Sequence, residues 1–126
     1  MKKNEHSLEL LQAKYEKAES LFLKLQIAEE LGGYGDRRGR HLAIRALLQE
    51  EDSRIRETAV RTLGVTCRRE DISLVKAVWE DPCESVAVLM AAWEVLPDME
   101  FSALSMPKKW ELLTAALFDD GNPLPQ

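Results

Sequence analysis

The feature that most constrains the fold is an apolar helical pattern that returns three times along the chain. Each copy has apolar residues at i, i+4 and i+8, a spacing that places them on one stripe of an α-helix. The last positions of the copies, Leu31, Leu63 and Leu96, are 32 and 33 residues apart. Three copies at this period predict an array of helix pairs rather than a single-core enzyme fold. The stripes are Leu23, Ile27 and Leu31; Ile55, Ala59 and Leu63; and Val88, Ala92 and Leu96.

A second helix precedes each of the later stripes, so the copies read as pairs. Residues 41–51 pair with 54–64, and residues 70–80 pair with 85–96. Gly32 and Gly64 follow their helices at a position where glycine commonly ends a helix, and Pro97 is expected to stop the third one. Residues 7–31 fit either one long helix or two helices with Ser20 as an N-cap, and agreement with the later copies favours two.

The second helix of the middle pair resembles a HEAT repeat of the short bacterial kind found in phycobilin-lyase-like proteins. Asp52, Ile55, Arg56, Ala59 and the Leu63-Gly64 pair carry this resemblance. It implies an all-α fold, a short α-solenoid of about three HEAT-like helix pairs. The third copy departs from the pattern because Leu89 stands where the second has Arg56. By the resemblance, Arg56 is a structural residue that reaches the Asp of the adjacent turn.

The resemblance also implies a candidate binding groove, because second helices line the concave face of such arrays. Arg54, Glu57 and Arg61 would face this groove in the second copy. Met90 and Glu94 would be their counterparts in the third copy, as Leu25 and Glu29 would be in the first. Trp93 occupies the repeat position of Val60, toward the flank, where an exposed tryptophan is a typical interface anchor.

Length and composition predict a single domain over residues 1–118 and a flexible tail over 119–126. Pro97–Met106 reads as a linker. A last helix follows Pro107, with Trp110, Leu113 and Leu117 on one face. This helix is expected to cap the open apolar end of the array.

The charge distribution is uneven. All nine arginines lie within residues 37–69, which contain only four acidic residues, and all eight lysines lie outside that segment. Residues 70–126 carry three lysines and eleven acidic residues. Arginine binds carboxylates and phosphates bidentately, so the cluster is a candidate site. Arg37, Arg38, Arg40 and Arg45 form a predicted secondary basic patch at one edge, and Arg68 and Arg69 are placed at another.

No catalytic, metal or cofactor site is predicted. Neither histidine has a carboxylate or nucleophile at a helical spacing that would make a catalytic pair. Cys67 and Cys83 lack metal-ligand spacing and are expected to be free thiols. The sequence has no secretory signal and no apolar run of membrane-spanning length, which favours a cytoplasmic protein without a membrane partner.

These observations favour a non-catalytic bacterial protein-binding module, a scaffold or adaptor, a chaperone or an immunity-type protein. Its partner would be another protein, bound through a helix or an extended segment. One alternative is nucleic-acid binding through the arginine-rich middle third, which the overall negative charge disfavours. Another alternative is a lyase-like or repair-type enzyme. The sequence leaves open whether the chain is a monomer or a homodimer.

Overall fold

The computed structural model describes residues 2–119 and, within them, the side chains of residues 6–117. Regular structure in this part of the chain is entirely helical, so the all-α prediction is confirmed. The helices are α1 (Lys2–Lys17), α2 (Leu21–Gly33), α3 (Arg40–Gln49), α4 (Ser53–Thr66), the short 3-10 helix η1 (Arg69–Asp71), α5 (Ile72–Trp79), α6 (Val86–Ser102) and α7 (Met106–Asp119).

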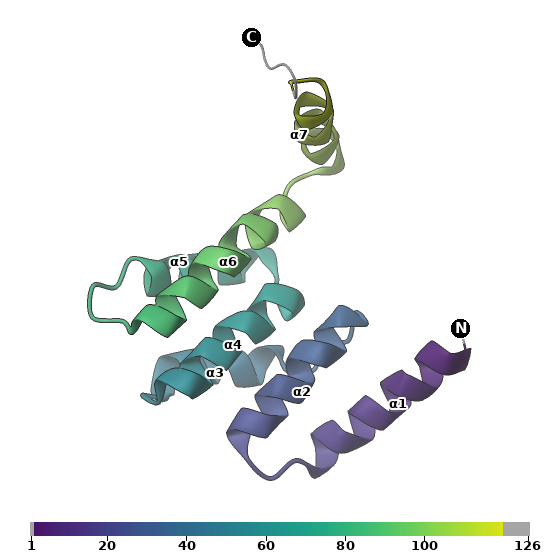
Figure 1. Ribbon diagram of the computed structural model, residues 1–126, viewed down its shortest axis with the longest axis vertical. Helices are drawn as coiled ribbons and strands as arrows, with labels where there is room; N and C mark the ends of the chain where they lie inside the picture. Colours follow the sequence, from purple (N-terminus) through teal and green to yellow (C-terminus); the bar gives the residue numbers. More distant parts are fainter. Residues whose placement is uncertain (1, 120–126) are drawn as a thin grey trace.

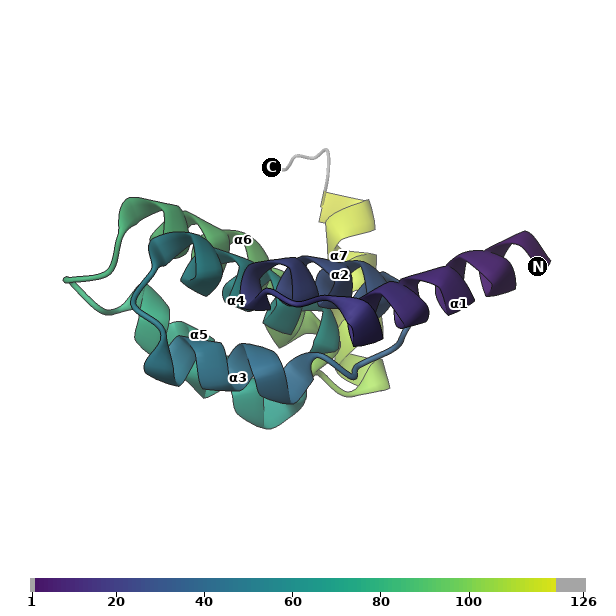
Figure 2. The same ribbon diagram turned by 90° about the horizontal axis from the view of Figure 1, so that it is seen from below.

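The helices form two layers. Figure 1 shows α2, α4 and α6 side by side, with α1 next to α2, and the view from below in Figure 2 places α3 and α5 together in a second layer. Helix α4 is central because it packs against α2, α3 and α6, while α6 packs against α4 and α5.

The first two helices separate where the repeat pattern requires it. Helix α1 ends at Lys17 and α2 begins at Leu21, and the Ser20 hydroxyl accepts a hydrogen bond from the Leu23 amide at 3.1 Å. This is the N-cap arrangement that satisfies a backbone donor at a helix start. The prediction of two helices over residues 7–31 is therefore confirmed.

The core follows the predicted stripes with one shift in α2. Ala59, Leu63, Val88 and Ala92 are fully buried, as the stripes of α4 and α6 predict, whereas Leu23 is exposed. Leu25, predicted to face the groove, is instead fully buried in the core, so that prediction is wrong. A smaller apolar cluster joins α1 to α2 and contains Tyr15, Ile27, Ala28 and Leu31.

Two glycines set the spacing between helices in the layer formed by α2, α4 and α6. A Cβ at Gly32 would clash with a Val65 methyl, and a Cβ at Gly64 would lie 2.7 Å from a Val95 methyl. Any larger residue at either position would have to displace the neighbouring helix. Glycine therefore permits the close approach of α2 to α4 and of α4 to α6.

Helix α6 continues through Pro97, contrary to the prediction that Pro97 ends it and opens a linker. Proline inside a helix removes a backbone hydrogen bond and costs about 3 kcal/mol. The helix nevertheless runs to Ser102, and Met99 beyond the proline is almost fully buried. Burial of Met99 and the adjacent Leu96 offsets the cost of the proline.

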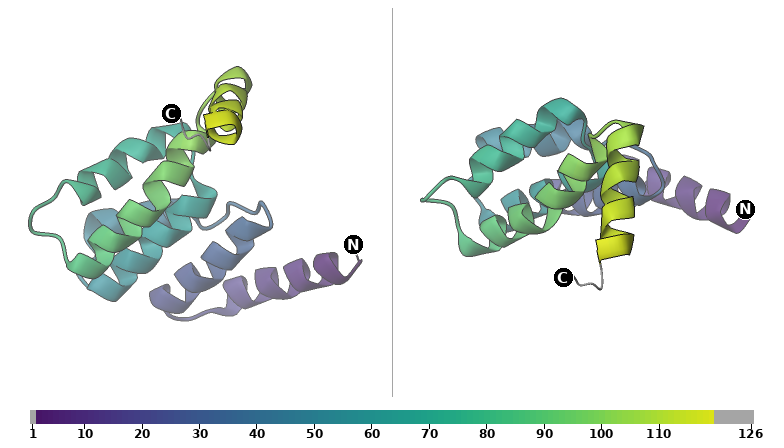
Figure 3. Two further views of the ribbon diagram at one scale, coloured as in Figure 1. Left: turned by 45° about the horizontal axis from the view of Figure 1, so that its top comes forward. Right: turned by 90° about the horizontal axis from the view of Figure 1, so that it is seen from above.

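Helix α7 forms where expected but does not cap the other helices. Figure 1 and both views in Figure 3 show it projecting beyond the end of α6. Its apolar side chains Trp110, Leu113 and Leu117 are exposed, so the prediction of a capping helix is wrong. Of the predicted flexible tail, only Asp119 belongs to the described residues, where it is the last residue of α7, and 120–126 lie outside them.

Candidate functional site

A row of charged residues runs across α2, α4 and α6, with one residue at the corresponding repeat position of each helix. Arg61 of α4 donates to Glu94 of α6 at 2.7 Å and also to Glu57 of its own helix at 3.4 Å. The hydrogen bond to Glu94 contributes most to raising the pKa of Arg61. Glu29 of α2 occupies the matching position, and burial raises the pKa of its carboxyl while Arg61 lowers it. The row therefore contains one ion pair between neighbouring helices, Arg61 with Glu94.

Arg54 is the most exposed of the predicted groove arginines. Its guanidinium lies 3.8 Å from Asp52 and 5.8 Å from the centre of the Phe22 ring. Side chains this exposed gain little from such ion pairs. Arg54 thus makes only a long ion pair among the described side chains, whereas Arg61 is already paired with Glu94, and a role of either arginine in binding stays a prediction.

Three apolar side chains form an exposed stripe on α6, and the predicted site residues Met90 and Trp93 belong to it. Val86, Met90 and Trp93 are 75%, 50% and 59% exposed. Their i, i+4, i+7 spacing places them on one face of the helix. We call these three residues the α6 stripe. It is opposite to the face of α6 that contains the buried Val88 and Ala92.

Comparison with α4 explains why the α6 stripe is exposed to solvent. Val60 holds the same repeat position in α4 as Trp93 does in α6, and it is fully buried. Helix α6 covers the flank of α4, whereas in the part of the chain that the structure describes no helix packs against the far side of α6. Trp93 is thus a large apolar side chain at a position that a neighbouring helix normally covers.

Arg56 is structural, as predicted, although its partner differs. Its guanidinium donates to the backbone oxygens of Leu47 and Glu50 at the end of α3, at 2.6 and 3.1 Å. It also pairs with Glu84 before α6 at 2.6 Å. The carboxylate that it reaches is therefore Glu84 rather than an aspartate. Arg56 thus links α3 and α4 to the segment that precedes α6.

The four residues of the predicted secondary basic patch do not form one surface. Arg40 is buried and makes two hydrogen bonds of 2.7 Å to the carboxylate of Asp71. Arg38 pairs with Asp36 at 3.0 Å, and Arg45 is exposed on α3. Arg37 and Arg45 make no ion pair with the described side chains, whereas Arg38 and Arg40 do, so the prediction of one basic patch from all four is wrong.

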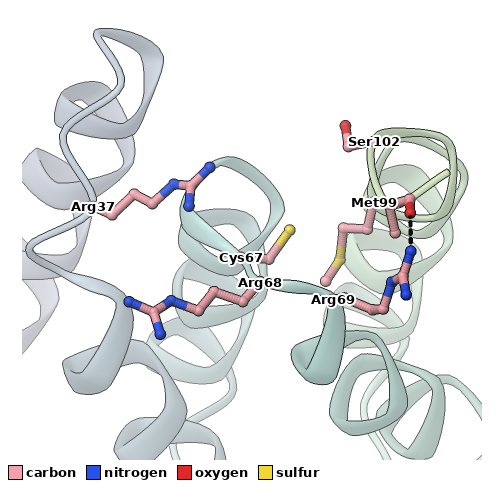
Figure 4. Close-up of a pocket in the computed structure, with 7 residues that line it drawn as sticks. Arg37, Cys67, Arg68, Arg69, Met99 and Ser102 are labelled. Carbon is pink, nitrogen blue, oxygen red and sulfur yellow. Dashed lines mark hydrogen bonds between the residues drawn. The ribbon is translucent and has the colours of Figure 1, made fainter. Parts of the chain in front are cut away.

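Arg37 instead joins Arg68 and Arg69, which had been assigned to a different edge. These three arginines line a cavity of about 310 Å³ together with Cys67, Met99, Ser102 and Ala103 (Figure 4). Arg37 and Arg69 are 32 residues apart, which is one repeat period. The structure places the segments that contain these arginines beside one pocket, so the spacing of 32 residues was the signal that sequence reasoning missed.

The described residues offer no metal site, since no group of three His, Cys, Asp or Glu side chains could hold an ion there. Cys67 and Cys83 are both free, as predicted. Among the helices described, none has the length and apolar character needed to cross a membrane.

Comparisons with family models, curated proteins and solved structures gave no match for this chain.

Proposed function

We propose that the chain is a non-catalytic protein-binding module, a cytosolic adaptor built as a short array of HEAT-like helix pairs. It holds an amphipathic helix of another protein against the α6 stripe. The observation that carries this proposal is the exposure of Trp93 at a repeat position where Val60 is fully buried. Exposed apolar stripes of this kind commonly mark interaction surfaces.

The repeat interpretation is supported by equivalences between copies. Glu29, Arg61 and Glu94 stand at matching positions on α2, α4 and α6. Gly32 and Gly64 each permit close approach of the next helix in the layer. The pairs in this interpretation are α1 with α2, α3 with α4, and α5 with α6.

The chemistry of α6 indicates the character of the partner. The helix contains no lysine or arginine and three exposed acidic residues: Glu94, which pairs with Arg61, Glu100, which pairs with Lys76, and Asp98, which has no ion pair with the described side chains. The stripe forms an apolar ridge that suits the groove of a second helix. A partner helix with an apolar face flanked by lysine or arginine would complement both features.

The first test uses a pair of designed helical peptides with the same leucine face and opposite charge. Peptide binding is followed by the fluorescence of Trp93 in a Trp79→Phe/Trp110→Phe background, so that only the stripe reports. We expect saturable binding of the lysine-flanked peptide and little binding of the glutamate-flanked one. Equal binding of both peptides would contradict the proposed partner chemistry.

The second test places the site by substitution, with capture of partners from host lysate as the readout. Met90→Ser/Trp93→Ser should abolish capture, whereas Trp110→Ser should preserve it, because Trp110 is even more exposed than Trp93 but lies on α7. Reversal of Arg54 and Arg61 to Glu should also leave capture intact. Capture that survives the stripe variant, or that vanishes with nuclease, would overturn the assignment.

A further inference from the structure

The basic pocket is assembled from three separate segments. Arg37 comes from the loop before α3, and Cys67 and the adjacent arginines come from the segment between α4 and α5. Met99 and Ser102 lie at the end of α6. Figure 4 shows Arg37 on one side of the cavity and Met99 with Ser102 on the other, and Cys67 lies between them.

The charges of this pocket are not neutralised by its own side chains. No residue that lines it is acidic. Among the side chains of residues 6–117, no carboxylate lies within ion-pair distance of Arg37, Arg68 or Arg69. By contrast, five other arginines pair with carboxylates: Arg38, Arg40, Arg54, Arg56 and Arg61.

The carboxylate of Asp71, close to the pocket along the chain, is already engaged. Asp71 accepts both hydrogen bonds of Arg40 and a further one from the Arg68 amide at 2.8 Å. Its carboxylate therefore has few acceptor positions left for the guanidinium groups at the pocket. Arg69 donates to the Ala103 backbone oxygen at 2.7 Å, which fixes its side chain at the rim while leaving other donors available.

The remaining lining residues suit a ligand with one charged and one less polar part. Burial raises the pKa of the Cys67 thiol, with Asp71 contributing in the same direction, so this group stays neutral and does not repel an anion. The Ser102 hydroxyl adds a donor at the rim, and the almost fully buried Met99 gives an apolar wall.

We propose that this pocket binds the phosphate group of a small phosphomonoester. Guanidinium groups donate to phosphate oxygens in pairs, and several arginines favour a dianion over a monocarboxylate. The cavity, at about 310 Å³, is at the small end of the range for ligand sites, which suits a phosphate that carries a few carbon atoms. The site is distinct from the α6 stripe and does not depend on the proposed protein partner.

The test uses glycerol 3-phosphate as the probe, with acetate and a single-stranded oligonucleotide without terminal phosphates as comparison arms. Cys67 lines the pocket, whereas Cys83 lies exposed in the turn before α6. The rate of thiol alkylation at each cysteine, at constant ionic strength, therefore reports occupancy with an internal control. We expect saturable slowing at Cys67 by glycerol 3-phosphate, no slowing by acetate, and an unchanged rate at Cys83.

The site is then located with Arg37→Gln/Arg68→Gln, and Arg45→Gln/Arg54→Gln is the matched control. The first pair carries no ion pair in the described part of the chain, so the variant should fold, which circular dichroism checks. We expect it to weaken glycerol 3-phosphate binding about tenfold or more, since hydrogen bonds between charged groups are lost. The control should bind as the wild type does.

Several results would overturn the proposal. Absence of saturable protection at Cys67, equal protection by acetate, or equal weakening in both double variants would each remove the phosphomonoester site. Protection by the oligonucleotide but not by glycerol 3-phosphate would replace it with a nucleic-acid surface.

Discussion

The Arg40→Met variant should lose about 3 kcal/mol of unfolding free energy. Arg40 and Asp71 share two hydrogen bonds of 2.7 Å, and their side chains are only 10% and 5% exposed. Removing one member of a buried ion pair typically costs about 3–5 kcal/mol. The lower end applies because the Arg68 amide still donates to Asp71. Methionine also keeps much of the apolar stem of arginine.

The same ion pair should shape the response of stability to acid. Burial alone would raise the pKa of Asp71, but hydrogen bonds from Arg40 and the Arg68 amide hold it below its ordinary value of 3.8. Because the folded-state pKa is the lower one, this contribution is present above the unfolded-state pKa and is lost as the pH falls through the folded value. Arg40→Met should therefore weaken the acid dependence. Asp36 retains part of it, since hydrogen bonds from Arg38 and Gln12 outweigh burial and lower its pKa too.

Urea unfolding followed by far-ultraviolet circular dichroism, repeated between pH 7 and about pH 3, measures both effects. Arg38→Met is the comparison variant: the Arg38 side chain is 34% exposed, against 10% for Arg40, so it should cost less than Arg40→Met, and it should alter the acid dependence through Asp36 instead of Asp71. An Arg40→Met protein within about 0.5 kcal/mol of wild type at neutral pH, or one with an unchanged acid slope, would refute the reasoning.

Three further variants test the packing. Gly64→Ala should destabilise by about 1–3 kcal/mol, because its Cβ would meet Val95, whereas Gly33→Ala, with open space around it, should be neutral or slightly stabilising in the same thermal melts. Ala59→Trp should prevent folding, since Ala59 is fully buried between helices; a soluble, fully helical variant with an unchanged melting temperature would contradict this packing. Truncation after Ser105 should leave the melting temperature nearly unchanged, because α7 buries little apolar surface; a large drop would show that α7 packs against the other helices.

The helical content could be predicted from the sequence because each prediction rested on local chemistry. Ser20 accepts an amide hydrogen bond as an N-cap serine does, so the break between α1 and α2 could be predicted from the sequence. The stripes of α4 and α6 were readable for the same reason, since the spacing of Ala59 and Leu63 depends on the helix period alone.

The failures share a different cause, which is packing between segments distant in sequence. Pro97 disfavours a helix locally, but burial of Met99 keeps α6 intact beyond it. Leu25 and Leu23 are two positions apart on α2, and the neighbours of that helix decide which of them is buried. Sequence reasoning chose Leu23, whereas the structure buries Leu25.

The same distinction between local chemistry and packing of distant segments applies to the candidate site. Trp93 was singled out because a large aromatic residue occupies the repeat position that Val60 holds in α4, and the structure leaves Trp93 exposed. The prediction that the groove charges form a binding surface stays a prediction, and the structure adds that Arg61 donates to Glu94 of the neighbouring helix, a contact that the sequence alone does not reveal. The grouping of Arg37 with Arg68 also required the loops of successive pairs to be placed in space.

Pro97 has a consequence for self-association. It stands one repeat after Gly64, which itself stands one repeat after Gly32, and both glycines leave room for the next helix of the layer. A pyrrolidine ring stands at the third position, where the two glycines carry no side chain. Proteins with open, matching ends are at risk of stacking head to tail into fibres. In the proposed array, we expect Pro97 to oppose the addition of a second copy to α6 at the spacing used inside the molecule, and so to oppose open-ended polymerisation while the nearby α6 stripe stays exposed.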